Sequence, residues 1–256
     1  MSETTLTDNA TPPAQEAEGT LAMVHLRVAD ADRAMTFFGA LCGWEAERVE
    51  FDDHLSHYTL NTGVTVRILD DQSEPPIVPN YRVSNVVATI RAIETAGGAV
   101  SSSDASADGS GWARGEDDQA VPFIVFRPGG YRGHAAPTRA PSADVGLVFI
   151  RADADRAGRF YGTTLGWELE RGHPDSFYFE AVPLVGVFDE AAAFGAEVTP
   201  SVTLYLSVDA LAPALARVEE LGGRAGPAAH DMGPYYSAVC TDDQGTTFGL
   251  MALALD

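Results

Sequence analysis

The chain has 256 residues, and its 37 acidic side chains outnumber its 16 basic ones, which gives a net charge of −21. A field of this sign repels nucleic acid and anionic membrane surfaces, so both are excluded as partners. All the basic residues are arginine, which excludes Schiff-base chemistry, lysine-bound pyridoxal phosphate and the phosphate loop that needs a lysine. The apolar runs are too short to span a membrane. A polar, acidic N-terminus and two isolated cysteines lead us to expect a cytoplasmic location.

Residues 1–20 contain few apolar side chains and are expected to form a disordered acidic tail. A strand is expected next over 23–28, followed by a helix that begins near Asp30 and ends at Gly43. Two more strands, at 57–61 and 64–69, complete a first strand–helix–strands module. A second module of the same order then follows, with a strand at 80–83, a helix at 86–96 and strands up to Phe126. The segment 101–119 is rich in Ser, Gly and Asp and is expected to be a long polar loop, of the kind that sometimes acts as a lid.

An internal repeat is the most informative feature of the sequence. Residues 26–48, LRVADADRAMTFFGALCGWEAER, align without gaps to residues 149–171, FIRADADRAGRFYGTTLGWELER. A match of this length indicates a duplicated unit. The second unit accordingly has expected strands at 146–150, 177–182, 186–188, 202–208, 236–241 and 247–252, with helices at 153–165 and 211–221. The expected domains are residues 21–135 and 145–256, joined by a linker over 136–144.

With these motifs in place, the chain resembles the vicinal oxygen chelate superfamily, which contains glyoxalases, extradiol dioxygenases and bleomycin-resistance proteins. The resemblance rests on the two repeated segments, on VEELGGRAG and on the closing GPYYSAVCTDDQGTTFGLM. It implies an α+β fold of tandem glyoxalase-like domains, in which four βαβββ modules form cup-shaped mixed sheets.

The resemblance also implies where a metal ion would be held in metal-dependent members. Those positions fall here on residues of which only one is a usual ligand, namely Met23, Val78, His134, Gly146, Val202 and Gly249. A stable divalent centre needs three or more converging donors. The sequence therefore predicts no metal and no cofactor.

Strand alternation suggests what the cups contain instead. In the first domain Met23, His25 and Arg27 share a face, and Arg132 and His134 share the face of the closing strand. His can act as a general acid or base and Arg can stabilise an oxyanion, so His25, His134, Arg27 and Arg132 are the candidate catalytic residues. The corresponding second-domain positions are apolar or small: Gly146, Val148, Ile150, Thr247, Gly249 and Met251.

Other residues are candidates for contact with a ligand. The predicted substrate-binding residues are Met23, His57, Trp112, Tyr178, Tyr235 and Tyr236. Trp44 and Trp167 occupy equivalent repeat positions and are expected to be core residues. Cys42 and Cys240 are expected to be small buried residues.

Three functions stay open at this point. The first is a metal-independent enzyme that isomerises, cyclises, dehydrates or ring-opens a small aromatic or carbonyl metabolite. The second is a binding protein that sequesters a small molecule without reaction, which the acidic surface would favour for a cationic drug. The third is a metal-dependent dioxygenase or lyase with an unusual site among His25, His54, His57 and His134. In each case the partner is a small-molecule ligand, and a homodimer is also open.

Overall fold

The structure is a computed structural model that describes residues 18–51, 55–62, 64–71, 76–127, 144–172, 177–182, 184–189, 192–193, 195, 199–232, 235–253 and 255. For residues 49–51, 55–57, 61–62 and 229–232 it describes the backbone alone. The predicted linker 136–144 lies outside the described residues except for Asp144, which begins a strand.

The first half of the chain forms one mixed sheet, which we call sheet A. Its strands have the order β2-β3-β4-β1-β5-β8-β7-β6. At its centre β1 and β5 are antiparallel, and each is flanked by a parallel neighbour, β4 and β8 respectively. The elements are β1 (Leu21–Val28), α1 (Ala31–Cys42), β2 (Arg48–Phe51), β3 (Leu55–Thr62), β4 (Val64–Asp70), β5 (Ile77–Arg82), α2 (Val86–Thr95), β6 (Ala99–Ala105), β7 (Gly111–Glu116) and β8 (Pro122–Arg127).

The second half forms sheet B with the same arrangement, in the order β10-β11-β12-β9-β13-β17-β16-β14, and β15 pairs with β16. The elements are β9 (Asp144–Arg151), α3 (Ala154–Leu165), β10 (Glu170–Arg171), β11 (Tyr178–Val182), β12 (Val185–Phe188), β13 (Ser201–Ser207), α5 (Leu211–Glu220), β14 (Arg224–Ala225), β15 (Ala229–Met232), β16 (Tyr235–Thr241) and β17 (Thr247–Ala252). The predicted α+β class with tandem βαβββ modules is confirmed.

The repeated motif forms matching helix ends. Asp30 and Asp153 cap α1 and α3, and each side chain accepts a hydrogen bond from the backbone N–H three residues later. Both helices end at a glycine in the left-handed conformation, Gly43 and Gly166. The tryptophan after each glycine is buried, as predicted, and Trp167 stacks on Tyr161 with ring centroids 4.5 Å apart.

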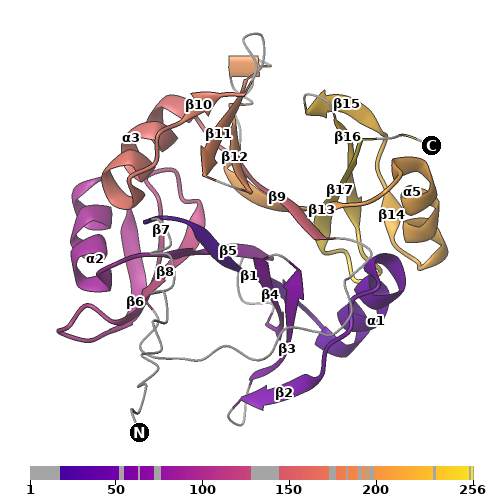
Figure 1. Cartoon of the computed structure of the whole chain (residues 1–256), viewed down its shortest axis with the longest axis horizontal. Coiled ribbons are helices and arrows are strands. Elements are labelled where there is room, and N and C mark those ends of the chain that lie inside the picture. Colours follow the sequence, from indigo (N-terminus) through magenta and orange to yellow (C-terminus); the bar gives the residue numbers. More distant parts are fainter. Residues whose placement is uncertain are drawn as a thin grey trace, which may run out of the picture.

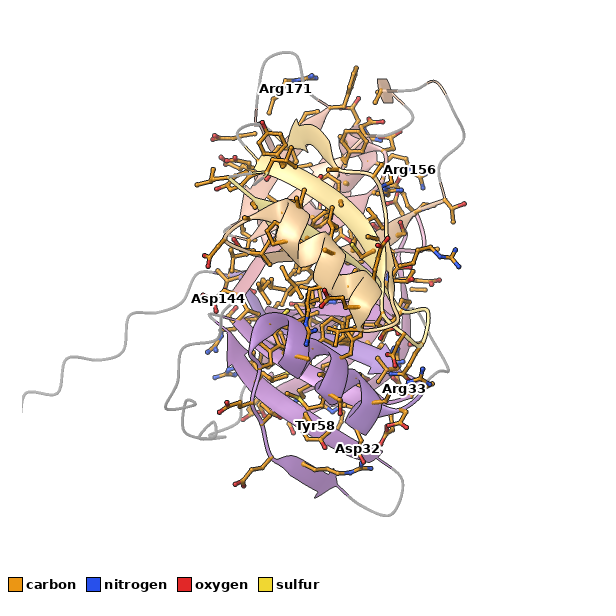
Figure 2. The ribbon with its side chains drawn as sticks, turned by 90° about the vertical axis from the view of Figure 1, so that its right-hand side faces the viewer. Asp32, Arg33, Tyr58, Asp144, Arg156 and Arg171 are labelled. Carbon is orange, nitrogen blue, oxygen red and sulfur yellow. The ribbon has the colours of Figure 1, made fainter. Side chains whose placement is uncertain are left out.

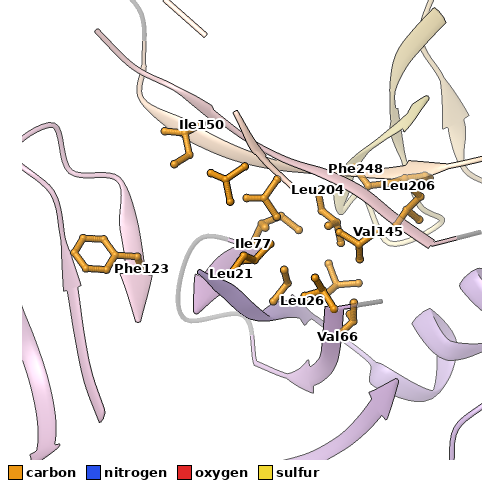
Figure 3. Close-up of a cluster of buried hydrophobic side chains, with 14 of the residues drawn as sticks. Leu21, Leu26, Val66, Ile77, Phe123, Val145, Ile150, Leu204, Leu206 and Phe248 are labelled. Atoms are coloured by element: carbon orange, nitrogen blue, oxygen red, sulfur yellow. The ribbon is translucent and has the colours of Figure 1, made fainter. Parts of the chain in front are cut away.

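The two sheets lie back to back, and each bends into a U that opens away from the other (Figure 1). Apolar side chains of the central strands meet between them, with Leu26 and Ile77 of sheet A facing Val145 and Leu204 of sheet B (Figure 3). Helices α2 and α3 lie together on one flank and α1 and α5 on the other (Figures 1 and 2). The helices and the opposite sheet therefore cover the convex face of each sheet. We call the opposite, concave face of each sheet its inner face.

Two matching contacts join the halves. Arg33 of α1 forms an ion pair with Asp243, and Gln244 donates to the backbone carbonyl of Asp30. At the pseudo-equivalent place, Arg156 of α3 pairs with Asp118. The sequence Asp-Asp-Gln occurs at 117–119 and 242–244, so each half offers the same turn to the helix start of the other half.

Two sequence expectations need correction. Segment 101–119 is not a loop for most of its length, because β6 and β7 pair there as a hairpin around a turn that contains Gly109. Its Ser-rich strand is an exposed sheet edge, which explains the polar composition. The end of the predicted tail is also ordered. Glu18 accepts hydrogen bonds from the Ser84 amide, and the Gly19 carbonyl accepts one from Trp167 Nε1 at 3.0 Å.

Candidate functional site on the inner faces of the sheets

The inner face of sheet A is the side turned away from the core. Strand β1 alternates cleanly: Val24, Leu26 and Val28 lie in the core, and the side chains between them lie on the inner face. The pairing registers show which residues of the neighbouring strands lie on the same face as these side chains. Its described members include Met23, His25, Arg27, Thr65, Arg67, Leu69, Val78, Asn80, Arg82, Trp112, Arg114, Ile124 and Phe126.

Among the described residues, four arginines lie on this face, Arg27, Arg67, Arg82 and Arg114, although the chain as a whole is strongly acidic. The Arg27 side chain is only 7% exposed and forms an ion pair with Asp71 at 3.2 Å. Burial lowers the pKa of Arg27, and the attraction of Asp71 opposes that shift. Burial also lowers the pKa of Arg114, as does the positive charge of Arg27. The bend of the sheet therefore brings Arg114 of β7 into the field of Arg27 and Asp71.

His25 lies next to this group. It is directly opposite Arg67 on the neighbouring parallel strand β4, and two residues before Arg27 on its own strand. That spacing is about 6.5 Å along a strand. On the other side, Asn80 is 3% exposed and donates to the Val78 carbonyl. The inner face of sheet A thus offers an imidazole flanked by guanidinium groups.

The inner face of sheet B is aromatic instead. Phe149 stacks between Tyr178 and Phe188, with centroid distances of 5.9 and 5.7 Å, and meets Tyr205 edge to face. Glycines make room for these rings: a Cβ on Gly186 would lie 2.2 Å from Tyr178, and one on Gly249 would lie 2.2 Å from Tyr205. Burial, followed by the nearby Glu180 and Tyr235, raises the pKa of Tyr178 to about 12.

The two halves of the repeat do not present equivalent residues. Val148 and Ile150 align with His25 and Arg27 but belong to the core, contrary to the expectation that they face the second cup. Each central strand has a bulge, at Ala22 in sheet A but at Gly146 in sheet B, one alignment position later. The shift reverses the faces, because alternate residues point to opposite sides of a strand. Thr247, Gly249 and Met251 lie on the inner side as expected.

The predicted site residues fall into three groups. Met23, His25, Arg27 and Trp112 lie on the inner face of sheet A, where Trp112 is 41% exposed. Tyr178 and Tyr235 border the aromatic cluster of sheet B, whereas Tyr236 packs against the core on the opposite face, because neighbouring strand residues alternate. Outside the described side chains lie His54, His57, Arg132 and His134.

Sequence reasoning missed several members of the sheet A face. Arg67, Arg82, Arg114, Asp71 and Asn80 were not among the predicted residues. A signal was present for two of them, because the small or apolar residues on either side of Arg67 in VTVRIL and of Arg114 in GWARGE predict strands in which the arginine lies on the face opposite to its neighbours.

Five of the six positions at which the resemblance places metal ligands do not suit a divalent ion, and the sixth, His134, lies outside the described residues. Met23 and Val78 on sheet A, and Gly146 and Gly249 on sheet B, carry no nitrogen or oxygen donor, and Val202 packs against the core. Among the side chains that the structure describes, no three His, Cys, Asp or Glu residues converge in a way that could hold a metal. Cys42 and Cys240 are both buried, as expected, and burial raises the pKa of each thiol.

Comparisons with known proteins agree with this architecture. The family model of the glyoxalase-like domain matches residues 146–251. The Mn(II)-bound glyoxalase from Novosphingobium aromaticivorans is similar, with a TM-score of 0.60 and 16% identity over 93% of this chain and 83% of that one. The 2,3-dioxygenase LapB from Pseudomonas sp. KL28 has a TM-score of 0.59 and 10% identity, over 92% and 93% of the two chains. A catechol 2,3-dioxygenase has a TM-score of 0.55 and 15% identity, over 92% and 88%. No curated protein matches the chain.

Within the described part of the chain, no helix is both long enough and apolar enough to cross a membrane. The bent sheets, the duplicated modules and these similarities lead to one structural conclusion. The chain has the two-domain fold of these glyoxalase and dioxygenase structures, and residues 146–251 match the family model of the glyoxalase-like domain.

Proposed function

We propose that the protein is a metal-independent enzyme that performs acid–base chemistry on a small carbonyl-containing or aromatic metabolite at the inner face of sheet A. The observation that carries this proposal is the placement of His25 opposite Arg67 and two residues from the buried Arg27. An imidazole titrates near neutral pH and can move a proton, and a guanidinium can stabilise the enolate or phenolate that the proton leaves behind.

Each residue has a role in this scheme. His25 takes a proton from, or gives one to, a carbon or oxygen next to the substrate carbonyl. Arg67 faces the oxygen on which negative charge develops. Met23 and Val78, on the same face, provide apolar contact for the carbon skeleton. Isomerisation, cyclisation, dehydration and ring opening all begin with such a transfer. Arg132 and His134 stay predicted members of the site.

Proton exchange tests this function before the substrate is known. Small ketones, keto acids and phenols are incubated with the chelator-treated protein in D2O, and loss of C–H signals is followed by NMR. A positioned general base accelerates exchange by about 10²–10⁴-fold, so His25→Gln should remove that acceleration for any compound that exchanges. Arg91→Gln, on the exposed side of α2, is the matched control. Exchange equal in the wild-type and His25→Gln proteins, or exchange lost only after metal removal, would contradict the proposal.

A second candidate function, binding without reaction, is favoured by the stacked rings on sheet B. Tyr178 and Phe188 are half-buried and stack on the buried Phe149, so a planar molecule can stack on their rings, and the acidic charge attracts cations. A planar cation such as acridine orange should then bind the wild-type protein, and Tyr178→Ala should weaken this binding while His25→Gln leaves it unchanged. Binding that is insensitive to Tyr178→Ala would count against this function. The cytoplasmic location and the homodimer stay predictions.

A further inference from the structure

We propose that the inner face of sheet B binds an organic cation, whose flat body stacks on Tyr178 while its positive charge lies at Glu170 and Glu180. This inference rests on the second candidate function, binding at the aromatic cluster, and adds the chemical class of the ligand and the residues that recognise it. It starts from three features of this face, which are stacked rings, two carboxylates opposite each other and a buried hydroxyl group.

The two carboxylates lie beside the Tyr178 ring. Glu170 of the edge strand β10 is directly opposite Glu180 of β11 (Figure 1), and we call these two residues the acidic pair. Phe179 packs against the core, so its neighbours Tyr178 and Glu180 share the inner face. Atomic distances agree, because a Cβ on Gly172 would lie 2.5 Å from Tyr178 Cδ1 and 3.7 Å from Glu180 Cγ. The acidic pair therefore borders the aromatic cluster.

Neither member of the acidic pair has an ion-pair partner within the described part of the chain. Both side chains are exposed, and neither forms a hydrogen bond with a described residue. The Arg171 guanidinium lies 4.9 Å over the Phe179 ring, on the other face of the sheet, and Arg151 is opposite Phe188, two strands from β11. Like charges directly opposite each other destabilise a strand pair. A cationic ligand would relieve this repulsion, and the net charge of −21 would attract it.

A buried hydroxyl group on the same face lacks a partner. Thr203 of β13 is directly opposite Phe149 and lies on the inner face, because Val202 and Leu204 on either side of it pack in the core. Thr203 is 7% exposed, and its side chain forms no hydrogen bond with any residue that the structure describes. A polar group that is buried without a partner costs free energy, so a ligand that forms a hydrogen bond with Thr203 is favoured.

The register gives the size of the ligand. Glu180 is opposite Gly186, which is opposite Phe149. Thr203 is the next residue in this row, three strands from Glu180, which is about 14 Å. Between them the Tyr178 ring lies over Gly186 and stacks on Phe149. Aromatic faces attract positive charge as well as flat apolar groups, so the expected ligand is a planar cation with a hydrogen-bonding group at its edge.

Fluorescence titration at pH 8 tests the role of charge, with N-methylacridinium as a permanent cation and acridine as an uncharged molecule of nearly the same shape. N-methylacridinium should bind about threefold or more tightly than acridine. Glu170→Gln and Glu180→Gln should each weaken N-methylacridinium binding about two- to fivefold, the range of an exposed ion pair, and leave acridine binding unchanged. Glu94→Gln, on the exposed side of α2, removes the same charge and should change neither affinity.

Two further substitutions test the rings and the hydroxyl group. Tyr178→Ala should weaken the binding of both probes about tenfold, because both lose the ring on which they stack. Proflavine, a planar cation with amino groups at its edge, can donate a hydrogen bond to Thr203. Thr203→Val should therefore weaken proflavine binding about two- to tenfold and leave N-methylacridinium binding unchanged.

The opposite results separate this inference from the function on which it rests. Equal affinity for N-methylacridinium and acridine, cation binding that survives both glutamate substitutions, or an equal loss in Glu94→Gln would overturn the cation and leave an aromatic binding surface. Binding of neither probe, or binding that is insensitive to Tyr178→Ala, would overturn the second candidate function as well. Unfolding midpoints identify any variant that fails to fold, and Tyr178→Phe, which keeps the ring, should bind both probes as the wild type does.

Discussion

Replacing Arg27 separates a role in binding from a role in stability. The side chain is 7% exposed and lies 3.2 Å from Asp71. Burial lowers the pKa of Arg27 more than the attraction of Asp71 raises it, so the folded protein disfavours the charged form relative to water. If Arg27 is retained for a ligand, replacing it together with Asp71 should cost little stability.

Buried ion pairs give the expected size of the effect. Replacing both partners with uncharged side chains of similar volume is commonly neutral or stabilising by about 1–4 kcal/mol, whereas removing one partner costs about 3–5 kcal/mol. Because Asp71 is 22% exposed and water screens the pair, we expect both effects to lie at or below the lower limit of these ranges. The double variant Arg27→Met/Asp71→Asn should be about 0–2 kcal/mol more stable than wild type, and Asp71→Asn alone about 1–3 kcal/mol less stable.

Urea unfolding at pH 7, followed by far-UV circular dichroism, measures these differences. Buried ion pairs whose two partners are replaced together rarely lose more than about 2 kcal/mol of stability. A larger loss in the double variant would refute this reasoning and show that Arg27 serves to stabilise the fold.

Three further predictions follow from other contacts. Asp242 is 2% exposed, and its carboxylate accepts hydrogen bonds from the backbone amides of Gln244 and Thr246. Burial raises the pKa of this carboxyl. Asp242→Ala should therefore lower the free energy of unfolding by about 1–3 kcal/mol, whereas Asp242→Asn, which keeps an acceptor oxygen, should not. Because a raised pKa means that the folded state holds the proton more tightly, stability from this group should fall as pH rises through the window just above the ordinary value of Asp, and pH-dependent unfolding of Asp242→Asn should lack that component. A Cβ at Gly186 would lie 2.2 Å from Tyr178, so Gly186→Ala should lower the free energy of unfolding by about 1–3 kcal/mol and change the near-ultraviolet spectrum of the tyrosines. Gly195→Ala is the control, because nothing lies near that position; its cost should come from the positive φ, and the spectrum should not change.

Much of the fold could be predicted from local signals. The ADADRA segments give the helix starts, the following Gly-Trp pairs give the helix ends and buried tryptophans, and the alternation in β1 places His25 and Arg27 on one face. These features depend on neighbouring residues, and a single sequence contains them. The reciprocal Asp-Asp-Gln contacts were visible as a repeated tripeptide, but only the packing of the two halves shows which helix each turn meets.

The rest depends on packing that the sequence does not express. The strand segment LVFI at 147–150 is apolar throughout, so alternation cannot say which side chains enter the core, and the position of one bulge decides it. Arg114 could be placed on the inner face by its strand, but its approach to Arg27 depends on the bend of an eight-stranded sheet.

The most direct test of the account is to observe His25 while the ligand binds. The protein contains six histidines, and their imidazole signals can be separated in a 15N-histidine-labelled sample, with His25 assigned by its absence in His25→Gln. A compound whose protons exchange in the presence of the protein should shift the His25 signal in a saturable manner. A His25 signal that stays constant when that compound binds, or while the tyrosine signals of sheet B respond instead, would contradict the assignment of the site to the inner face of sheet A.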